Sequence, residues 1–158
     1  MKAFLCACGF AMALALATTP ARAQAFPRGG ITLAEMAQWL RTNGYQEQSV
    51  RLQNGRVALR TAAGGYGFYI HFYDCNGGPR CASLQFRVGF STHGRYSLAR
   101  ENTWNGSHRW AYGHTDIRDD PWLTMDVDLY PGGNYQLLGD EFGIWRHVLN
   151  GFAKSIHF

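Results

Sequence analysis

The sequence is poor in charged side chains, and lysine is almost missing from it. Asp, Glu, Lys and Arg together make up 16% of the 158 residues, and the lysines are Lys2 and Lys154 alone. The other basic residues are arginines scattered along the chain, whereas a surface that binds nucleic acid needs basic side chains in a cluster. We therefore expect no nucleic-acid partner.

The short signatures of three common catalytic classes are also absent. The chain has no Gly-x-Ser-x-Gly elbow, no phosphate-binding loop and no His-Glu-x-x-His pair. Residues 64–67 are rich in glycine, but they join two expected strands and lack the helix N-terminus that forms an anion site. We accordingly predict no catalytic residues, no cofactor and no metal, and we do not expect an enzyme.

Apolar and aromatic side chains, by contrast, are plentiful. Apolar residues make up 46% of the chain and aromatic residues 15%. This composition excludes a disordered or low-complexity chain. The length corresponds to one domain, so we expect a single hydrophobic core.

The one long apolar run lies at the N-terminus and predicts a signal peptide. It begins with a basic residue, Lys2, continues through the apolar residues 3–17, and ends in small residues of the kind that signal peptidase reads. We expect residues 1–23 to be removed by cleavage after Ala23, or after Ala25 at an overlapping site. The run is too short for a helix that spans a bilayer, so no membrane span is expected after cleavage.

Processing would leave residues 24–158 as a single domain in the periplasm or outside the cell. The formal charge of this domain is +2 instead of the +4 of the whole chain, because Lys2 and Arg22 are removed. Its calculated basicity is therefore smaller than that of the full sequence.

Two cysteines, Cys75 and Cys81, remain in the processed chain. Exported proteins usually join such a pair, and the residues between them are turn formers. The resulting disulfide would stabilise the fold by about 2 kcal/mol, because the loop that it closes is small. The alternative is half of a metal site with His71, although zinc requires three or four ligands at compact spacing.

The pattern of apolar residues predicts an α+β domain with the order helix, four strands, helix, two strands, helix. Thr32 and Glu35 form a capping box at the start of the first helix, and Asn54-Gly55 predicts a two-residue hairpin turn. We expect Trp104 in the core and Asn105 as a cap at the end of the second helix. The expected segments are residues 32–43, 49–53, 56–61, 68–73, 82–90, 97–105, 108–114, 123–129 and 138–156. Tight turns make neighbouring strands antiparallel, and the helices are expected to cover one face of the sheet.

The outward positions of these strands are more aromatic than a solvated surface requires. Large aromatic patches with polar surroundings mark surfaces that bind partners, whereas the alternative is core packing beneath a loop or a second helix. The residues expected on this face are Tyr69, His71, Tyr73, Trp110, Tyr112 and Trp122.

Histidine and aspartate residues on the same strands support a second hypothesis, a small periplasmic metal-binding protein or enzyme. The residues that it would use are His71, His108, His114 and Asp126. The alternative is that they are polar members of a solvent-facing sheet surface. In that case Asp126 and Asp128 are solvated, or Asp126 pairs with an arginine such as Arg87 or Arg109.

Several short motifs follow one another through the domain. They are Phe72-Tyr73-Asp74-Cys75, residues 81–86, residues 102–105, residues 125–129, Gly132-Gly133, and Trp145 with Phe152 seven residues later. In this order and spacing, with the helix that ends at Asn43-Gly44-Tyr45, they resemble the YbjN domain family of bacterial proteins over about residues 31–156. The hairpin around Tyr112-Gly113-His114 departs from the family's pattern.

The resemblance implies a fold like that of type III secretion chaperones, often dimeric, and a sensory or regulatory role. No catalytic residues come with it. Our leading hypothesis is therefore an exported, non-enzymatic binding or regulatory domain that holds a peptide or protein partner on its aromatic sheet face, with a homodimer as one expected assembly. The competing hypotheses are a structural envelope protein without a specific ligand and the metal-binding protein or enzyme described above.

Overall fold

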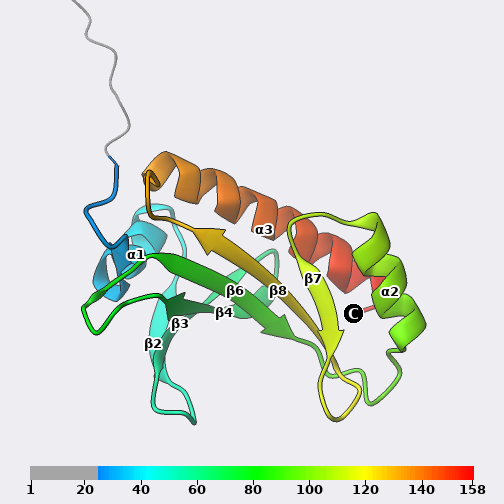
Figure 1. The fold of residues 1–158 in the computed structure, drawn as a ribbon. Coiled ribbons are helices and arrows are strands. Elements are labelled where there is room, and N and C mark those ends of the chain that lie inside the picture. The colour runs from blue at the N-terminus through cyan, green and yellow to red at the C-terminus, as the bar shows by residue number, and fades with distance from the viewer. Residues whose placement is uncertain (1–24) are drawn as a thin grey trace, which may run out of the picture.

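Helices α1 (Leu33–Thr42) and α3 (Tyr135–Ser155) lie on the same side of a twisted antiparallel sheet (Figure 1). The computed structural model describes residues 25–158. The predicted signal peptide, residues 1–23, lies outside this range. Within it, no helix is both long and apolar enough to cross a membrane.

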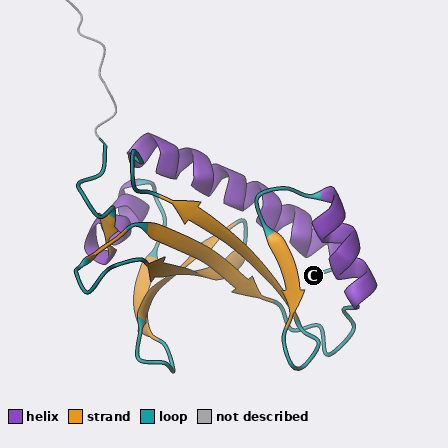
Figure 2. Cartoon of the chain, viewed as in Figure 1, coloured by secondary structure: helices purple, strands orange, loops and turns teal. Residues whose placement is uncertain are grey.

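The main sheet has six strands in the order β2-β3-β4-β6-β8-β7, and a separate pair is formed by β1 and β5. Neighbouring strands of both sheets are antiparallel, which confirms the predicted α+β class (Figure 2). The strands are β1 (Ile31–Thr32), β2 (Glu47–Arg51), β3 (Val57–Ala63), β4 (Tyr66–Tyr73), β5 (Arg80–Cys81), β6 (Ser83–Gly89), β7 (Tyr112–Thr115) and β8 (Pro121–Asp128). Helix α2 (Leu98–Ser107) lies beside β7.

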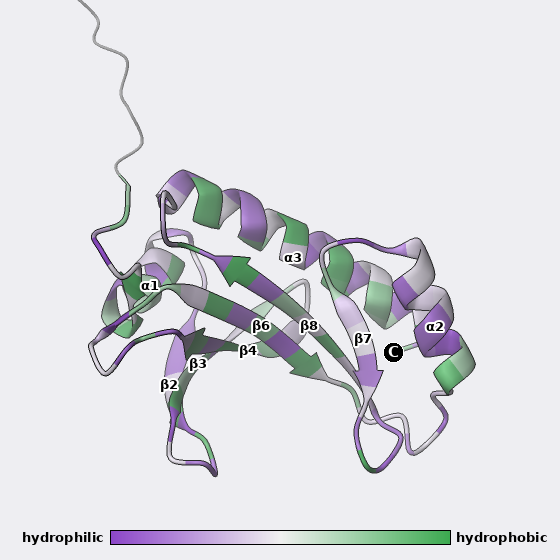
Figure 3. Ribbon diagram, viewed as in Figure 1, coloured by the Kyte–Doolittle hydropathy of each residue, from purple (hydrophilic) through white to green (hydrophobic). Residues whose placement is uncertain are grey.

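The core lies between α3 and the central strands. Alternate residues of β4, β6 and β8 point toward the helix and are buried, as their period of two predicts. Phe142 and Trp145 of α3 pack against Phe68 of β4 and Phe86 of β6, with ring centroids 5.4 to 5.9 Å apart. Figure 3 shows the alternation of apolar and polar residues along β6, β8 and α3. Burial of these large rings supplies much of the apolar area that leaves water on folding.

The second helix is longer than predicted, and the strand that follows is shorter. Helix α2 continues through Gly106 to Ser107, and the backbone N–H of His108 still donates to the carbonyl of Trp104 (3.0 Å). The imidazole of His108 stacks on the Trp104 ring at 3.5 Å. Trp110 then adopts φ 69°, outside extended geometry. The prediction of a strand over residues 108–114 is therefore wrong in its first half, and β7 begins at Tyr112.

The turn predicted at Asn54-Gly55 is also longer than expected. The last paired residues of β2 and β3 are Arg51 and Val57, so five residues connect the strands. Gly55 adopts φ 80° and donates its N–H to the carbonyl of Leu52 (2.9 Å), but Asn54 does not share the positive φ. A two-residue type I′ turn needs positive φ at both central residues. Between β3 and β4, Gly64 and Gly65 do both have positive φ and form the predicted turn.

The start of α1 is held by the predicted capping box and by an ion pair. The backbone N–H of Glu35 donates to Oγ1 of Thr32, and the Glu35 carboxylate accepts from the N–H of Thr32 in return. The same carboxylate accepts two hydrogen bonds from Arg80 of β5, at 2.7 and 2.9 Å. The neighbouring Cys81 lies at disulfide-bonding distance from Cys75, as predicted. These contacts connect α1, the β1–β5 pair and the end of β4.

Asn105 closes the outer edge of β7 instead of capping α2. Its Nδ2 donates to the carbonyl of Gly113 (2.9 Å), and its Oδ1 accepts from the N–H of Gly113 (2.7 Å). The carboxamide thereby replaces a neighbouring strand at this position. A Cβ at Gly113 would lie 3.0 Å from the Phe152 ring, so glycine allows β7 to pack closely against the core.

Glu35→Gln is expected to destabilise the protein at neutral pH. Burial raises the pKa of the Glu35 carboxyl, but hydrogen bonds from Arg80 and Thr32 together lower it by more, to below its ordinary value of 4.5. Such a carboxylate stabilises the fold above its unfolded-state pKa, and this contribution is lost as the pH falls through the folded-state value. Urea unfolding measures the free energy of unfolding of wild type and Glu35→Gln from pH 7 to pH 3. The difference between the two free energies should therefore become smaller below about pH 4.5. Gln136→Ala, an exposed and non-titrating position of α3, is the control and should show a difference from wild type that does not change with pH.

Asn105→Ala is expected to lower the free energy of unfolding by about 1–3 kcal/mol, because the buried backbone groups of Gly113 lose both partners. Thr103→Ala on the same helix is the matched control, since the Thr103 hydroxyl bonds only within α2, to the carbonyl of Ala99. Urea denaturation of both variants measures the difference. An equal loss in the two would contradict the assigned role of Asn105.

Candidate functional site: the open face of the sheet

The face of the main sheet that carries neither α1 nor α3 presents a group of aromatic and polar side chains. We call this surface the open face. Its side chains are those that alternate with the core residues along β3, β4, β6, β7 and β8. They are Arg60, Tyr69, His71, Tyr73, Ser83, Gln85, Arg87, Tyr112, His114, Trp122, Thr124, Asp126 and Asp128.

Strand register arranges these side chains in rows. Tyr69 of β4 pairs with Arg87 of β6, which pairs with Thr124 of β8, which pairs with Tyr112 of β7. Paired residues share a face, so this row runs across four strands. Arg87 therefore lies at the centre of the open face.

Two sets of rings lie on either side of this centre. On β4, the rings of Tyr69, His71 and Tyr73 follow one another with centroids 6.2 and 6.4 Å apart. On β7 and β8, His114 is 5.8 Å from Tyr112 and 6.5 Å from Trp122. The guanidinium of Arg87 lies 4.5 Å over the Trp122 ring, a stacking that holds both side chains in place.

Five of the six residues expected on this surface are on it, and Trp110 is not. Trp110 precedes β7, is 56% exposed, and its ring contacts the guanidinium of Arg109 (4.9 Å). The expectation that Trp110 shares a strand face with Tyr112 is wrong because the chain between α2 and β7 is not extended there.

Several polar atoms at the centre of the open face have no hydrogen-bond partner among the described residues. They are Nε of Arg87, Oγ1 of Thr124 and Nδ1 of His114. The Thr124 side chain is almost fully buried, and a buried polar group without a partner costs about 1–3 kcal/mol. These atoms are themselves buried, so a molecule bound on this face reaches them only when the side chains above them move aside.

The surroundings of the two histidines of the open face lower their pKa and so favour the neutral imidazole. Burial lowers the pKa of His71, and the positive charges of Arg87 and Arg56 lower it further. Burial and Arg87 also lower the pKa of His114, by more than Glu101 and Asp116 raise it. Neutral imidazoles can both donate and accept a hydrogen bond.

A hollow of about 450 Å³ lies at one end of the open face. Tyr69 and Trp122 contribute aromatic walls, while two arginines and two aspartates supply both signs of charge. Its lining includes Arg60, Tyr69, Asp116, Arg118, Asp120 and Trp122. Gly89 lies beneath Trp122, and a Cβ there would come within 2.6 Å of the indole ring. Glycine at this position therefore lets Trp122 lie flat against the sheet.

The four residues of the metal hypothesis are not brought together. His108 caps α2 and stacks on Trp104, away from the sheet strands. Asp126 accepts a hydrogen bond from Nε2 of Gln85 (2.8 Å), and neither Arg87 nor Arg109 forms an ion pair with it. Across residues 25–158, no group of three or more His, Cys, Asp and Glu side chains could hold a metal ion.

Sequence reasoning did not identify Arg87 as the central residue of the open face. The alternation of residues 82–90 indicated that Arg87 points outward, which is correct. The pattern could not show that β6 lies between β4 and β8, because strand order is set by contacts between distant segments. Arg56 was expected at the start of a strand but precedes β3, and its position 4.2 Å over Tyr73 was missed because it depends on the pairing of β3 with β4.

Comparison with protein families matches the chain to the YbjN family, described as "Putative bacterial sensory transduction regulator", over residues 32–158. The chain therefore belongs to this family, as the sequence motifs predicted. Comparisons with curated proteins and with solved structures find no match. The predicted similarity to type III secretion chaperones stays a prediction.

Arg87→Gln is expected to raise the pKa of both His71 and His114, because it removes a positive charge that disfavours their protonated forms. NMR titration of the imidazole signals from pH 4 to pH 8 measures both values. Arg109→Gln is the control, since Arg109 does not lie on this face. Unchanged values in Arg87→Gln would contradict the central position of Arg87.

Proposed function

We propose that this member of the YbjN family is an exported, non-enzymatic regulatory domain that holds a peptide segment of a partner protein on its open face. The sensory or regulatory role is that of the family, and the family description names no enzymatic activity. Export is supported by the N-terminal apolar run and by a cysteine pair at disulfide-bonding distance.

The observation that carries the proposal is the combination of aromatic rings and unpartnered polar atoms on a sheet face without a helix. Tyr112 is 47% exposed, and Tyr69, Tyr73 and Trp122 are each half-buried. Surfaces that bind proteins are enriched in Tyr, Trp and Arg and depleted in Lys. The open face has this composition, whereas an ordinary solvated sheet face is dominated by small polar and charged residues.

A peptide matches the chemistry of this surface. The rings of Tyr69 and Trp122 can contact apolar side chains, and the hollow between them carries charges of both signs. Nε of Arg87 can donate to a main-chain carbonyl, and Oγ1 of Thr124 can donate or accept, once the side chains that bury these atoms move aside. A second copy of this chain is the other possible occupant, and it would make the protein a homodimer.

Tyr112→Ala is expected to weaken peptide binding about tenfold or more, as is typical when an aromatic residue that anchors an interface is truncated. Peptides selected from a displayed random library on the processed domain provide the ligands, and isothermal titration calorimetry measures the affinities. Tyr135→Ala is the matched control, because Tyr135 is 43% exposed, has one close aromatic neighbour, and lies on α3 away from the open face.

Chemical-shift mapping of the same peptides locates the binding surface. Shifts confined to β4, β6, β7 and β8 support the proposal. Shifts on α1 and α3, or equal affinities for Tyr112→Ala and wild type, would overturn it. Light scattering of wild type and Tyr112→Ala tests the alternative occupant. A wild-type dimer that dissociates in Tyr112→Ala would show that a second copy of the chain, and not a peptide, occupies the open face.

A further inference from the structure

A second cavity, of about 350 Å³, lies between the loop before α2 and the end of α3, next to the hollow of the open face, with which it shares Ser91. Its basic lining residues are His93, Arg95, Arg100 and His157, and its apolar ones are Ile156 and Phe158. The remaining lining residues, Ser91, Thr92 and Tyr96, carry hydroxyl groups. None of the nine has an acidic side chain.

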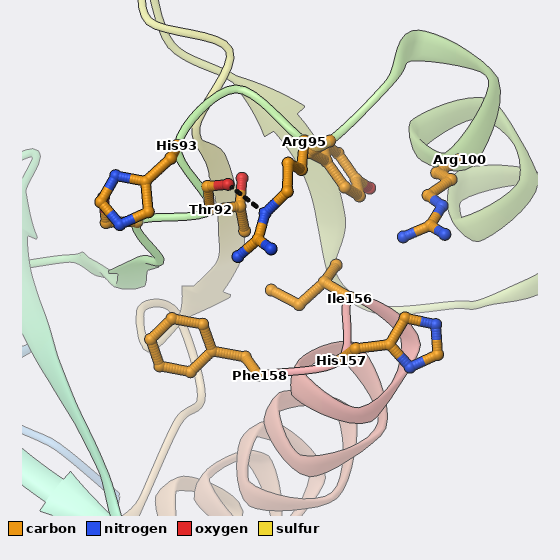
Figure 4. Close-up of a pocket in the computed structure, with 9 residues that line it drawn as sticks. Thr92, His93, Arg95, Arg100, Ile156, His157 and Phe158 are labelled. Atoms are coloured by element: carbon orange, nitrogen blue, oxygen red, sulfur yellow. Dashed lines mark hydrogen bonds between the residues drawn. The ribbon is translucent and has the colours of Figure 1, made fainter.

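The two arginines of this cavity are free to bind an anion. The ion pairs among residues 25–158 join other arginines to Glu47, Glu35 and Asp116, and they involve neither Arg95 nor Arg100. Figure 4 shows the guanidinium groups of Arg95 and Arg100 entering the cavity from different elements, Arg95 from the loop and Arg100 from α2. Arg100 belongs to the first turn of α2, where the helix dipole adds positive potential.

The walls of the cavity are held in place before any ligand binds. Nε of Arg95 donates to the carbonyl of Thr92 (3.0 Å), which fixes the side chain, and its two terminal nitrogens have no hydrogen-bond partner among residues 25–158 (Figure 4). The Thr92 N–H donates to the carboxylate of Asp120 (2.7 Å). On the opposite wall, the N–H of Phe158 donates to the carbonyl of Ala153 (3.0 Å), and its ring contacts Phe90. Preorganised walls reduce the entropy lost on binding.

Tyr96 provides an independent indication of a polar ligand. Its side chain is 95% buried, since only 5% is exposed, and its hydroxyl has no hydrogen-bond partner among the described residues. Burial raises the pKa of Tyr96, and the nearby charge of Glu101 raises it further, so the hydroxyl remains a donor. Glu101 itself does not line the cavity.

We propose that this cavity is a binding site for a small organic oxyanion, a phosphate ester or a carboxylate. The anionic group would lie between Arg95 and Arg100, because guanidinium groups bind carboxylate and phosphate oxygens through paired hydrogen bonds. The organic part would contact Ile156 and Phe158, whose side chains form the floor in Figure 4. The site is distinct from the open face, and it gives a sensory domain a place for a small-molecule signal.

The test is an NMR titration of the isotope-labelled processed domain with three probes: phenyl phosphate, benzoate and the uncharged phenol. We expect phenyl phosphate, benzoate or both to shift the signals of Arg95, Arg100 and Phe158, and phenol to leave them unchanged. Whichever anion binds more tightly identifies the phosphate or the carboxylate as the natural group.

Arg95→Gln and Arg100→Gln should each weaken anion binding about tenfold or more, since each removes charged hydrogen bonds. Arg146→Gln is the matched control, an exposed arginine of α3 that does not line the cavity. Both target residues are exposed, and circular dichroism verifies that the variants fold. The proposal would be overturned if neither anion binds at millimolar concentration, if phenol binds equally well, or if the three variants bind with equal affinity. None of these outcomes would affect the proposed role of the open face.

Discussion

The packing of Phe142 and Trp145 against Phe68 and Phe86 is the contact on which the rest of the structure depends. These four rings join the middle of α3 to the two central strands, β4 and β6, and they are almost completely buried. Because α3 is the long helix and covers this face, the core is built on one side of the sheet only. The opposite side is left as a surface, and its aromatic side chains cannot be explained by the packing of the core.

The same one-sided arrangement explains how the open face is ordered. Each inward residue of β4, β6 and β8 is fixed by the core, and the pleat then orients the residues between them outward. The register places Arg87 between Tyr69 and Thr124, and its guanidinium lies over the ring of Trp122. A slip of one residue would exchange the two faces, so the hydrophobic core that stabilises the fold also determines the geometry of the open face.

The β7 edge of the main sheet is closed by a side chain and lies close to an anchored loop. At the β7 edge, Asn105 satisfies the backbone of Gly113, so a further strand cannot pair there without displacing it. Close to this edge, the loop from Phe90 to Ser97 joins β6 to α2 and is held to the sheet through Asp120. Ser91 in this loop lines both the hollow of the open face and the basic cavity. Two surfaces of different chemistry therefore share one anchored segment.

The sequence by itself determined the features that depend on neighbouring residues. The capping box of Thr32 and Glu35, the turn at Gly64-Gly65, and the alternation along residues 68–73 and 82–90 each require only local spacing, and the structure contains all of them. The family assignment also followed from ordered local motifs.

Only the tertiary structure decided which of these local elements meet. Alternation at every second residue suggested a strand through His108 and Trp110. In the structure, His108 instead stacks on Trp104, and Trp104 packs against Phe152 in the core. The position of Arg87, the role of Asn105 and the convergence of Arg95 with His157 all join residues that are far apart in the chain or in different elements. Strand order and helix docking bring them together, and no local pattern encodes either.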